Sequence, residues 1–241
     1  AEAKAQEYGG EATADFQQVL ANPKVEAVEI CTPHYTHARL VLAALEAGKH
    51  VLVEKPMATN VEDAKEMIAT AKRKGLQLGV IFQNRYNDAS RAVKEVIEKG
   101  ELGRILAARA FLTWHRSDEY YKLDPWRGTW AQEGGGVLIN QAIHTLDLMQ
   151  WLMGKIQTVS ASCRRWGHPH IEVEDTAEAY FRFANGALGC FYANNCYPTD
   201  EPIFFEVTGE KGKAQIVADR ATITIDGDTR EVKPQAESVT H

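Results

Sequence analysis

Apolar positions in the first third of the chain form short, nearly continuous runs that alternate with amphipathic segments. The runs predict strands at Val25 to Cys31, His50 to Val53 and Leu76 to Phe82. Helices are predicted between them, from Tyr35 to Ala47 and from Thr59 or Asn60 to Gly75, because apolar residues recur there at helical spacing. Apolar strands joined by helices are typical of a parallel sheet with right-handed crossovers.

The pattern changes after Gln83-Asn84-Arg85-Tyr86, where polar and apolar residues begin to alternate with a period of two, most clearly from Thr176 to Phe183. Asn185-Gly186 and Asp226-Gly227 are typical hairpin turns, so the second sheet is predicted to be mainly antiparallel. Strands are predicted at Arg104 to His115, Thr158 to Trp166, Thr176 to Phe183, Leu188 to Asn194, Phe204 to Thr208, Ala214 to Val217 and Ala221 to Ile225.

Two helices interrupt this strand-rich part. One is predicted over about Ser90 to Lys99, and a longer one from Val137 to Met153, opened by Gly134-Gly135-Gly136. The fold class is therefore α/β, with a parallel domain over residues 1–84 and an α+β domain with a large, mainly antiparallel sheet over residues 85–241.

The composition argues against two classes of binding partner and indicates a cellular location. The net charge of −6 and the lack of a basic run argue against a nucleic-acid partner. No apolar stretch approaches the roughly 20 residues that a membrane helix needs, so no membrane partner is expected. The four cysteines lie far apart without a CxxC pair, which favours reduced thiols and a cytoplasmic location. Cys190 and Cys196 could pair in principle, but buried thiols are the better interpretation.

Two motifs carry candidate chemistry. Glu54-Lys55-Pro56 follows a predicted strand, and open parallel sheets bind ligands at the carboxyl ends of their strands. Asn140 and His144 are four residues apart, on one face of the predicted long helix. A lysine, a histidine and an amide that converge on one pocket could manage a proton while a hydride moves.

A metal site is not predicted. His168-Pro169-His170, Glu172 and Glu174 invite that interpretation, but a site needs three or four converging ligands and these residues lie in a predicted loop. Gly209-Glu210-Lys211-Gly212 lacks the spacing of a phosphate-binding loop and is interpreted as a polar turn.

Several motifs together resemble one protein family. They are Thr32-Pro33-His34-Tyr35-Thr36-His37, Gly48 to Pro56, Trp126-Arg127-Gly128 and the glycine-led segment that contains His144 and Asp147. In this order and spacing they resemble the Gfo/Idh/MocA family of NAD(P)-dependent oxidoreductases, which act mostly on sugars, polyols and related carbonyls. The resemblance runs through nearly the whole chain and implies that the first domain is a partial Rossmann-type sheet.

The resemblance also implies site residues. His144 matches the family's usual proton-transfer histidine, and Lys55 touches both cofactor and substrate hydroxyl. Contacts with NAD or NADP are implied for Thr32, Pro33, His37, Glu54, Lys55, Pro56, Gln83, Asn84 and Arg127.

The chain departs from the family pattern in two ways. Asn140 stands where the family often has an aspartate, so His144 lacks a possible carboxylate partner. The glycine loop GxGxxG and the acidic residue that reads the adenosine ribose are not found. We therefore expect that the sheet lacks its first strands and that the chain is truncated at both ends, which leaves the choice between NAD and NADP open.

The expected reaction is oxidation of an alcohol or reduction of a ketone by hydride exchange with the nicotinamide. His144 would accept the hydroxyl proton as general base, Lys55 would stabilise the developing alkoxide, and Asn140 would bind a substrate hydroxyl. Three aromatic residues, Tyr120, Tyr121 and Trp126, are candidates for contact with a sugar ring.

The sequence is also compatible with two other functions. A redox glycosidase of the same fold would oxidise a sugar transiently, eliminate the leaving group and reduce the sugar again. A truncated, non-catalytic module would be unable to bind the cofactor alone. Since family members often pair through the antiparallel sheet, a homo-oligomer is also expected.

Overall fold

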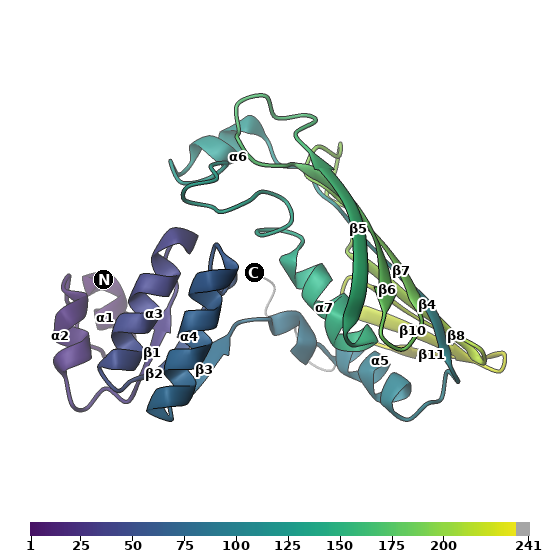
Figure 1. Ribbon diagram of the computed structural model, residues 1–241, viewed down its shortest axis with the longest axis horizontal. Helices are drawn as coiled ribbons and strands as arrows, with labels where there is room; N and C mark the ends of the chain where they lie inside the picture. Colours follow the sequence, from purple (N-terminus) through teal and green to yellow (C-terminus); the bar gives the residue numbers. More distant parts are fainter. Residues whose placement is uncertain (235–241) are drawn as a thin grey trace. The chain divides into compact units, whose positions relative to one another are not determined.

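The computed structural model describes residues 1–234, and it divides into two compact units, Ala1–Ile81 and the residues from Phe82 onward (Figure 1). Residues 235–241, the end of the second predicted domain, lie outside the described residues. Each unit has its own core of buried apolar side chains.

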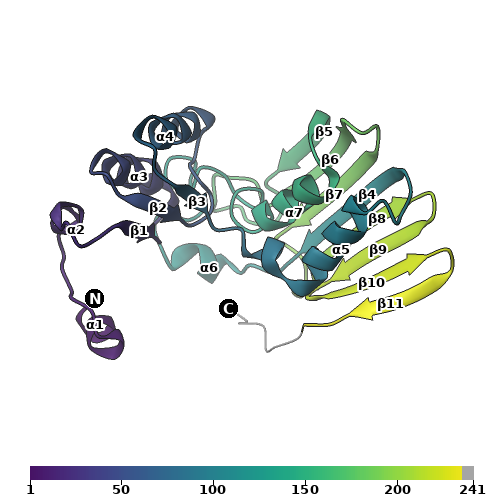
Figure 2. The ribbon, with the colours of Figure 1, turned by 90° about the horizontal axis from the view of Figure 1, so that it is seen from below.

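The first unit is built on a three-stranded parallel sheet in the order β1-β2-β3. Its strands are β1 (Ala27–Ile30), β2 (His50–Val53) and β3 (Leu78–Val80), connected by α3 (His37–Glu46) and α4 (Val61–Lys74). Both helices cover the same face of the sheet (Figure 2). The predicted parallel α/β arrangement is confirmed; β2 has the predicted bounds, and β1 and β3 are one or two residues shorter at each end than predicted.

The helices of this unit begin where the sequence signals a cap. The Asn60 side chain accepts a hydrogen bond of 2.8 Å from the backbone N–H of Asp63, and Asp15 caps α2 (Phe16–Ala21) in the same way. Such a side chain replaces one of the backbone acceptors that a first helical turn lacks. The remaining helices of the unit are α1 (Glu2–Tyr8) and the short 3₁₀ helix η1 (His34–Thr36).

The second unit contains an eight-stranded sheet in the order β11-β10-β9-β8-β4-β7-β6-β5. All its neighbouring strands are antiparallel except β4 and β7, so the predicted mainly antiparallel sheet is confirmed. The strands are β4 (Ile105–Thr113), β5 (Ile156–Arg164), β6 (Thr176–Phe183), β7 (Leu188–Asn194), β8 (Phe204–Gly209), β9 (Gly212–Val217), β10 (Arg220–Ile225) and β11 (Asp228–Val232).

Helices α5 (Asp88–Glu98) and α7 (Ile143–Met153) pack on one face of this sheet and bury its core (Figure 2). The short helices η2 (Gln83–Tyr86) and α6 (Asp118–Lys122) complete the unit, and α6 was not predicted from the sequence.

The predicted helix from Val137 to Met153 is wrong in its first part, because α7 begins only at Ile143. The preceding residues form turns that the buried Glu174 holds: its carboxylate accepts from Gly136 N and Leu138 N at 3.0 Å. Gly136 is required there, since an added Cβ would lie 1.8 Å from the Glu174 carbonyl oxygen. Asn140 therefore lies in a turn before the helix, and its relation to His144 does not come from a continuous helical face.

No helix within residues 1–234 is both long enough and apolar enough to cross a membrane. The cysteines Cys31, Cys163, Cys190 and Cys196 are all free, so Cys190 and Cys196 do not form a disulfide.

Candidate active site

In the first unit, the predicted cofactor residues gather at the carboxyl ends of β1 and β2. Glu54 N donates to Ile30 O at 2.9 Å, and Ile81 N donates to Val53 O at the same distance, so the three strands end level with one another. Thr32 and Pro33 follow β1 after one residue, and Glu54-Lys55-Pro56 follows β2 directly. Both motifs therefore lie at the same end of the sheet, where the carboxyl ends of its strands meet.

His37 joins these two strand ends. Its buried ring places Nδ1 2.7 Å from the Pro56 carbonyl oxygen and Nε2 2.7 Å from the Thr32 carbonyl oxygen. The Lys55–Pro56 peptide bond is cis, and Lys55 N donates to the Glu54 carboxylate at 3.0 Å. His37 thereby holds the two loops together, and its direct contact with a cofactor stays a prediction.

In the second unit, the Tyr120 hydroxyl accepts hydrogen bonds from side chains for which the sequence predicted different roles. Arg127 Nη1 donates to it at 2.5 Å, Gln141 Nε2 at 3.0 Å and Asn140 Nδ2 at 3.5 Å. The Arg127 guanidinium also lies over the rings of Tyr120 and Trp126, at 4.5 and 4.8 Å from their centroids. A predicted cofactor residue, a predicted catalytic residue and two predicted substrate residues are therefore neighbours in this unit.

Tyr121 is directed inward. Its ring contacts Tyr120 and His168 edge to face, and its hydroxyl accepts from Asn195 Nδ2 at 3.2 Å. Burial raises the pKa of Tyr121, so its hydroxyl is a neutral hydrogen-bonding group at ordinary pH. Its role as a substrate contact stays a prediction.

Gln83 and Asn84 lie in η2, next to an ion pair that the sequence did not reveal. Arg85 donates from Nε and Nη2 to the two carboxylate oxygens of Asp147 in α7, at 2.7 and 2.5 Å. The edge of the His144 ring lies against Phe82, with 6.0 Å between the ring centroids. Asp147 is thus paired with Arg85, and this pair attaches η2 to α7.

Sequence reasoning missed Glu133, which is 1% exposed. Its two carboxylate oxygens accept from Asn140 Nδ2 at 2.6 Å and from Gly128 N at 2.5 Å. Burial raises the pKa of Glu133, although both hydrogen bonds oppose that rise. A glutamate before a glycine run is typical of a surface turn, so only its position one residue before the triple glycine could have drawn attention to it.

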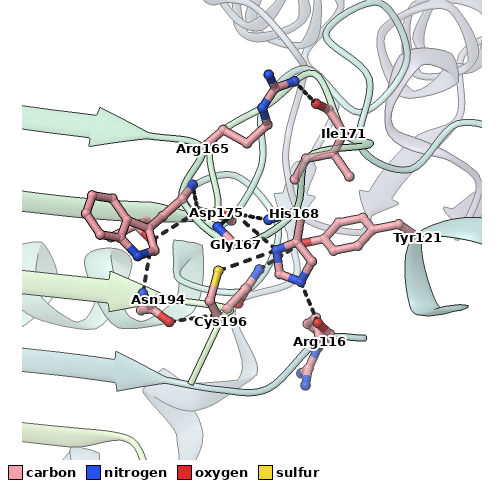
Figure 3. Close-up of polar contacts among 12 residues, drawn as sticks. Arg116, Tyr121, Arg165, Gly167, His168, Ile171, Asp175, Asn194 and Cys196 are labelled. Atoms are coloured by element: carbon pink, nitrogen blue, oxygen red, sulfur yellow. Dashed lines mark hydrogen bonds and ion pairs between the residues drawn. The ribbon is translucent and has the colours of Figure 1, made fainter. Parts of the chain in front are cut away.

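A second buried cluster surrounds His168 (Figure 3). His168 Nδ1 lies 3.1 Å from Asp175 Oδ2, and Nε2 lies 2.6 Å from the Arg116 carbonyl oxygen. Asp175 also accepts from the backbone N–H groups of Trp166 and Gly167, at 2.7 and 2.9 Å. Because both ring nitrogens face oxygen acceptors, the geometry suits a protonated imidazole, and the pKa of His168 is raised chiefly by its hydrogen bond to Asp175.

Cys196 completes this cluster, since ligand atoms of His168, Asp175 and Cys196 lie within 4.8 Å of one another. Burial and the neighbouring Asp175 carboxylate raise the pKa of Cys196 to about 12, so that in this environment the side chain is a neutral thiol. The Asp175 oxygens are also occupied by N–H donors. We therefore interpret the cluster as a structural ion pair.

A parallel α/β unit with polar groups at its strand ends, followed by an α+β unit on a large sheet, is the arrangement typical of two-domain nucleotide-binding proteins. Residues 1–82 match the family described as "Oxidoreductase family, NAD-binding Rossmann fold", and residues 90–215 match the GFO/IDH/MocA C-terminal domain. The chain belongs to the Gfo/Idh/MocA family.

Relatives with known activities are similar over most of the chain. Levoglucosan dehydrogenase of Pseudarthrobacter phenanthrenivorans is 31% identical over 86% of this chain and 60% of its own length. The scyllo-inositol 2-dehydrogenase (NAD(+)) of Bacillus subtilis is 31% identical over 88% of this chain and 61% of its own length. The chain thus spans about 60% of the length of these curated relatives.

Solved structures agree with this placement. Levoglucosan dehydrogenase in complex with NADH and levoglucosan has a TM-score of 0.89 at 30% identity, over 97% of this chain and 68% of that chain. The WlbA dehydrogenase of Bordetella pertussis, in complex with NADH and UDP-GlcNAcA, has a TM-score of 0.85 at 33% identity, over 98% of this chain and 71% of that chain.

Proposed function

We propose that the protein transfers a hydride between NAD and a sugar, a polyol or a related carbonyl compound. The observation that carries the proposal is the family match across both units, with Glu54-Lys55-Pro56 at the carboxyl end of β2. Relatives named as dehydrogenases of levoglucosan and of scyllo-inositol support the substrate class, and their names and bound NADH support NAD.

The residues at the strand ends fit a dinucleotide. The Thr32 and Thr36 hydroxyls lie 2.5 Å apart beside Pro33. The half-buried Lys55, which follows β2, contributes an ammonium group at the same end of the sheet. When bound, the nicotinamide would supply the hydride acceptor. The residues that would hold the dinucleotide are Thr32, Pro33, His37, Glu54, Lys55, Pro56, Gln83, Asn84 and Arg127.

The remaining steps fall to residues of the chain. His144 accepts the proton of the substrate hydroxyl, and Lys55, as an ammonium, stabilises the alkoxide that develops as this proton leaves. Asn140 binds a substrate hydroxyl. Tyr120, Tyr121 and Trp126 are the proposed contacts for the sugar ring.

His144→Ala should lower the kcat for polyol oxidation about 100-fold, because a positioned general base typically contributes that much or more. The rate of NADH formation from levoglucosan, myo-inositol and scyllo-inositol would be measured with the intact protein. Added imidazole should restore part of the lost rate, which a purely structural defect would not allow. Unchanged turnover would remove His144 from the mechanism.

We also propose that the protein is a homo-oligomer and works in the cytoplasm, where its thiols stay reduced. The sheet face opposite α5 and α7 carries the exposed apolar side chains of Tyr180 and Leu188, which line one hollow together with Arg182. Exposed apolar patches of this kind often mark protein interfaces.

Tyr180→Asp should convert the oligomer to monomers, because it places a charge on the proposed interface. Sedimentation velocity measures the mass, and Tyr35→Asp, at an exposed tyrosine of the first unit, is the matched control. A monomeric wild-type protein at micromolar concentration would refute the oligomer.

A further inference from the structure

The side chains of Glu133 and Asn140 form a buried carboxylate–amide pair. They are 1% and 8% exposed, and Asn140 Nδ2 lies 2.6 Å from Glu133 Oε1. The other carboxylate oxygen, Oε2, accepts from Gly128 N at 2.5 Å. Each oxygen of Glu133 therefore faces an N–H donor, and a carboxylate is the side chain that can accept at both positions.

This pair determines which way the Asn140 amide faces. The amide nitrogen is directed to Glu133 at 2.6 Å and, more weakly, to the Tyr120 hydroxyl at 3.5 Å. Because the nitrogen faces these two oxygens, the amide presents its carbonyl oxygen, an acceptor, to any other group. A reversed amide would place the carbonyl oxygen against the carboxylate, which is repulsive, so the buried Glu133 selects one of two orientations.

We propose that Glu133 is a positioning residue that makes Asn140 a hydrogen-bond acceptor toward the substrate. Asn140 then accepts from a substrate hydroxyl and discriminates against a carbonyl or ether oxygen at the same point, because two acceptors facing each other in a buried site leave both unsatisfied. This inference rests on the proposed function in one respect, namely that Asn140 contacts the substrate.

Exchange of the two functional groups provides a sharp test. In Glu133→Gln, the new amide can accept from Gly128 N with its oxygen, but its nitrogen then faces Asn140 Nδ2. Asn140 must turn over and present its nitrogen to the substrate. In Glu133→Gln/Asn140→Asp, the glutamine nitrogen donates to the new carboxylate, and residue 140 again presents an acceptor.

The single change Asn140→Asp places a second carboxylate beside Glu133, and the two can remain close only by sharing a proton. The folded protein then retains a proton that the unfolded chain releases above a pKa of about 4. Its stability relative to wild type should therefore decrease as pH rises from 5 to about 8, and thermal unfolding measures the decrease. The double variant should not show this dependence.

The orientation itself can be measured without a substrate. In ¹⁵N NMR spectra, the Asn140 side-chain amide should have one downfield proton that exchanges slowly with water, and Glu133→Gln should abolish that protection. Glu119→Gln, at a glutamate in α6, is the control and should leave the signal unchanged. An Asn140 amide that is unaffected by Glu133→Gln would overturn the proposal.

Kinetics with NAD and the polyol that the wild type oxidises fastest provides the second measurement. Glu133→Gln should lower kcat/KM about tenfold, as expected for one reversed hydrogen bond. The double variant should recover most of that loss. Unchanged kinetics in Glu133→Gln, or a double variant as impaired as both single changes combined, would reduce Glu133 to a structural role and refute the proposal. If wild type oxidises no polyol, the proposed function fails, while the amide signal still decides the orientation.

Discussion

Replacing Lys55 by methionine should lower the kcat for polyol oxidation by about 100-fold or more, while the protein remains folded. The methionine retains the apolar part of the side chain but removes the ammonium that we propose stabilises the developing alkoxide. Removal of one such electrostatic group typically costs a factor of this size. The initial rate of NADH formation at saturating polyol measures the loss.

Two further variants separate the charge of Lys55 from its geometry. Lys55→Arg keeps a positive charge but spreads it over a planar guanidinium, so it should recover only a small part of the rate. Lys65→Met, at an exposed lysine of α4, controls for the general loss of a positive charge. Turnover near that of wild type in Lys55→Met would remove Lys55 from the chemistry.

The second large effect is expected on stability. Asp175→Asn should lower the free energy of unfolding by about 3 kcal/mol, because it leaves the buried His168 without its charge partner. The Asp175 side chain is 0% exposed, and its oxygens accept from Trp166 N and Gly167 N as well as from His168. An asparagine nitrogen at either oxygen position would face a backbone N–H. Urea unfolding of wild type and variant measures the difference.

The effect of Asp175→Asn should depend on pH. Burial alone would raise the pKa of Asp175, but the hydrogen bonds from His168 and from the backbone hold it far below its usual range. Its contribution is therefore present above a pH of about 4 and is lost as pH falls below that value. The pKa of His168 is raised, so its contribution is present below about 6.5 and is lost as pH rises through its folded-state pKa.

The stability difference between wild type and Asp175→Asn should consequently be largest between pH of about 4 and 6.5. Glu178→Gln is the control, since the exposed ion pair of Glu178 with Arg164, at 3.7 Å, should contribute less than about 1 kcal/mol. If Asp175→Asn lowers the free energy of unfolding no more than Glu178→Gln does, the buried ion pair does not stabilise the protein as proposed.

The sequence predicted the two sheets because their hydrophobic patterns differ in kind. Val51, Leu52 and Val53 form a short continuous run of apolar residues, although Leu52 is exposed in the structure, whereas apolar and polar residues alternate from Thr176 to Phe183. These patterns depend on near neighbours in the chain. Cap residues such as Asn60 act over three residues, and they too were predictable.

Interactions between distant residues were not predictable in this way. The start of α7 was placed too early because Glu174, 38 positions after Gly136, binds the backbone that would otherwise begin the helix. The pairing of Asp147 with Arg85, 62 positions apart, was missed for the same reason. For Lys55 and His144, the sequence supplied candidate chemistry through family motifs, and their roles stay predictions.

Transfer of a hydride from the substrate to the nicotinamide can be followed with a deuterium label. The intact protein would be incubated with NAD and polyols that carry deuterium on their hydroxyl-bearing carbons, and the cofactor would then be analysed by mass spectrometry. If the proposed reaction occurs, reduced cofactor accumulates and carries one deuterium. Unlabelled cofactor from every polyol, or cleavage of a glycoside without net formation of NADH, would contradict it.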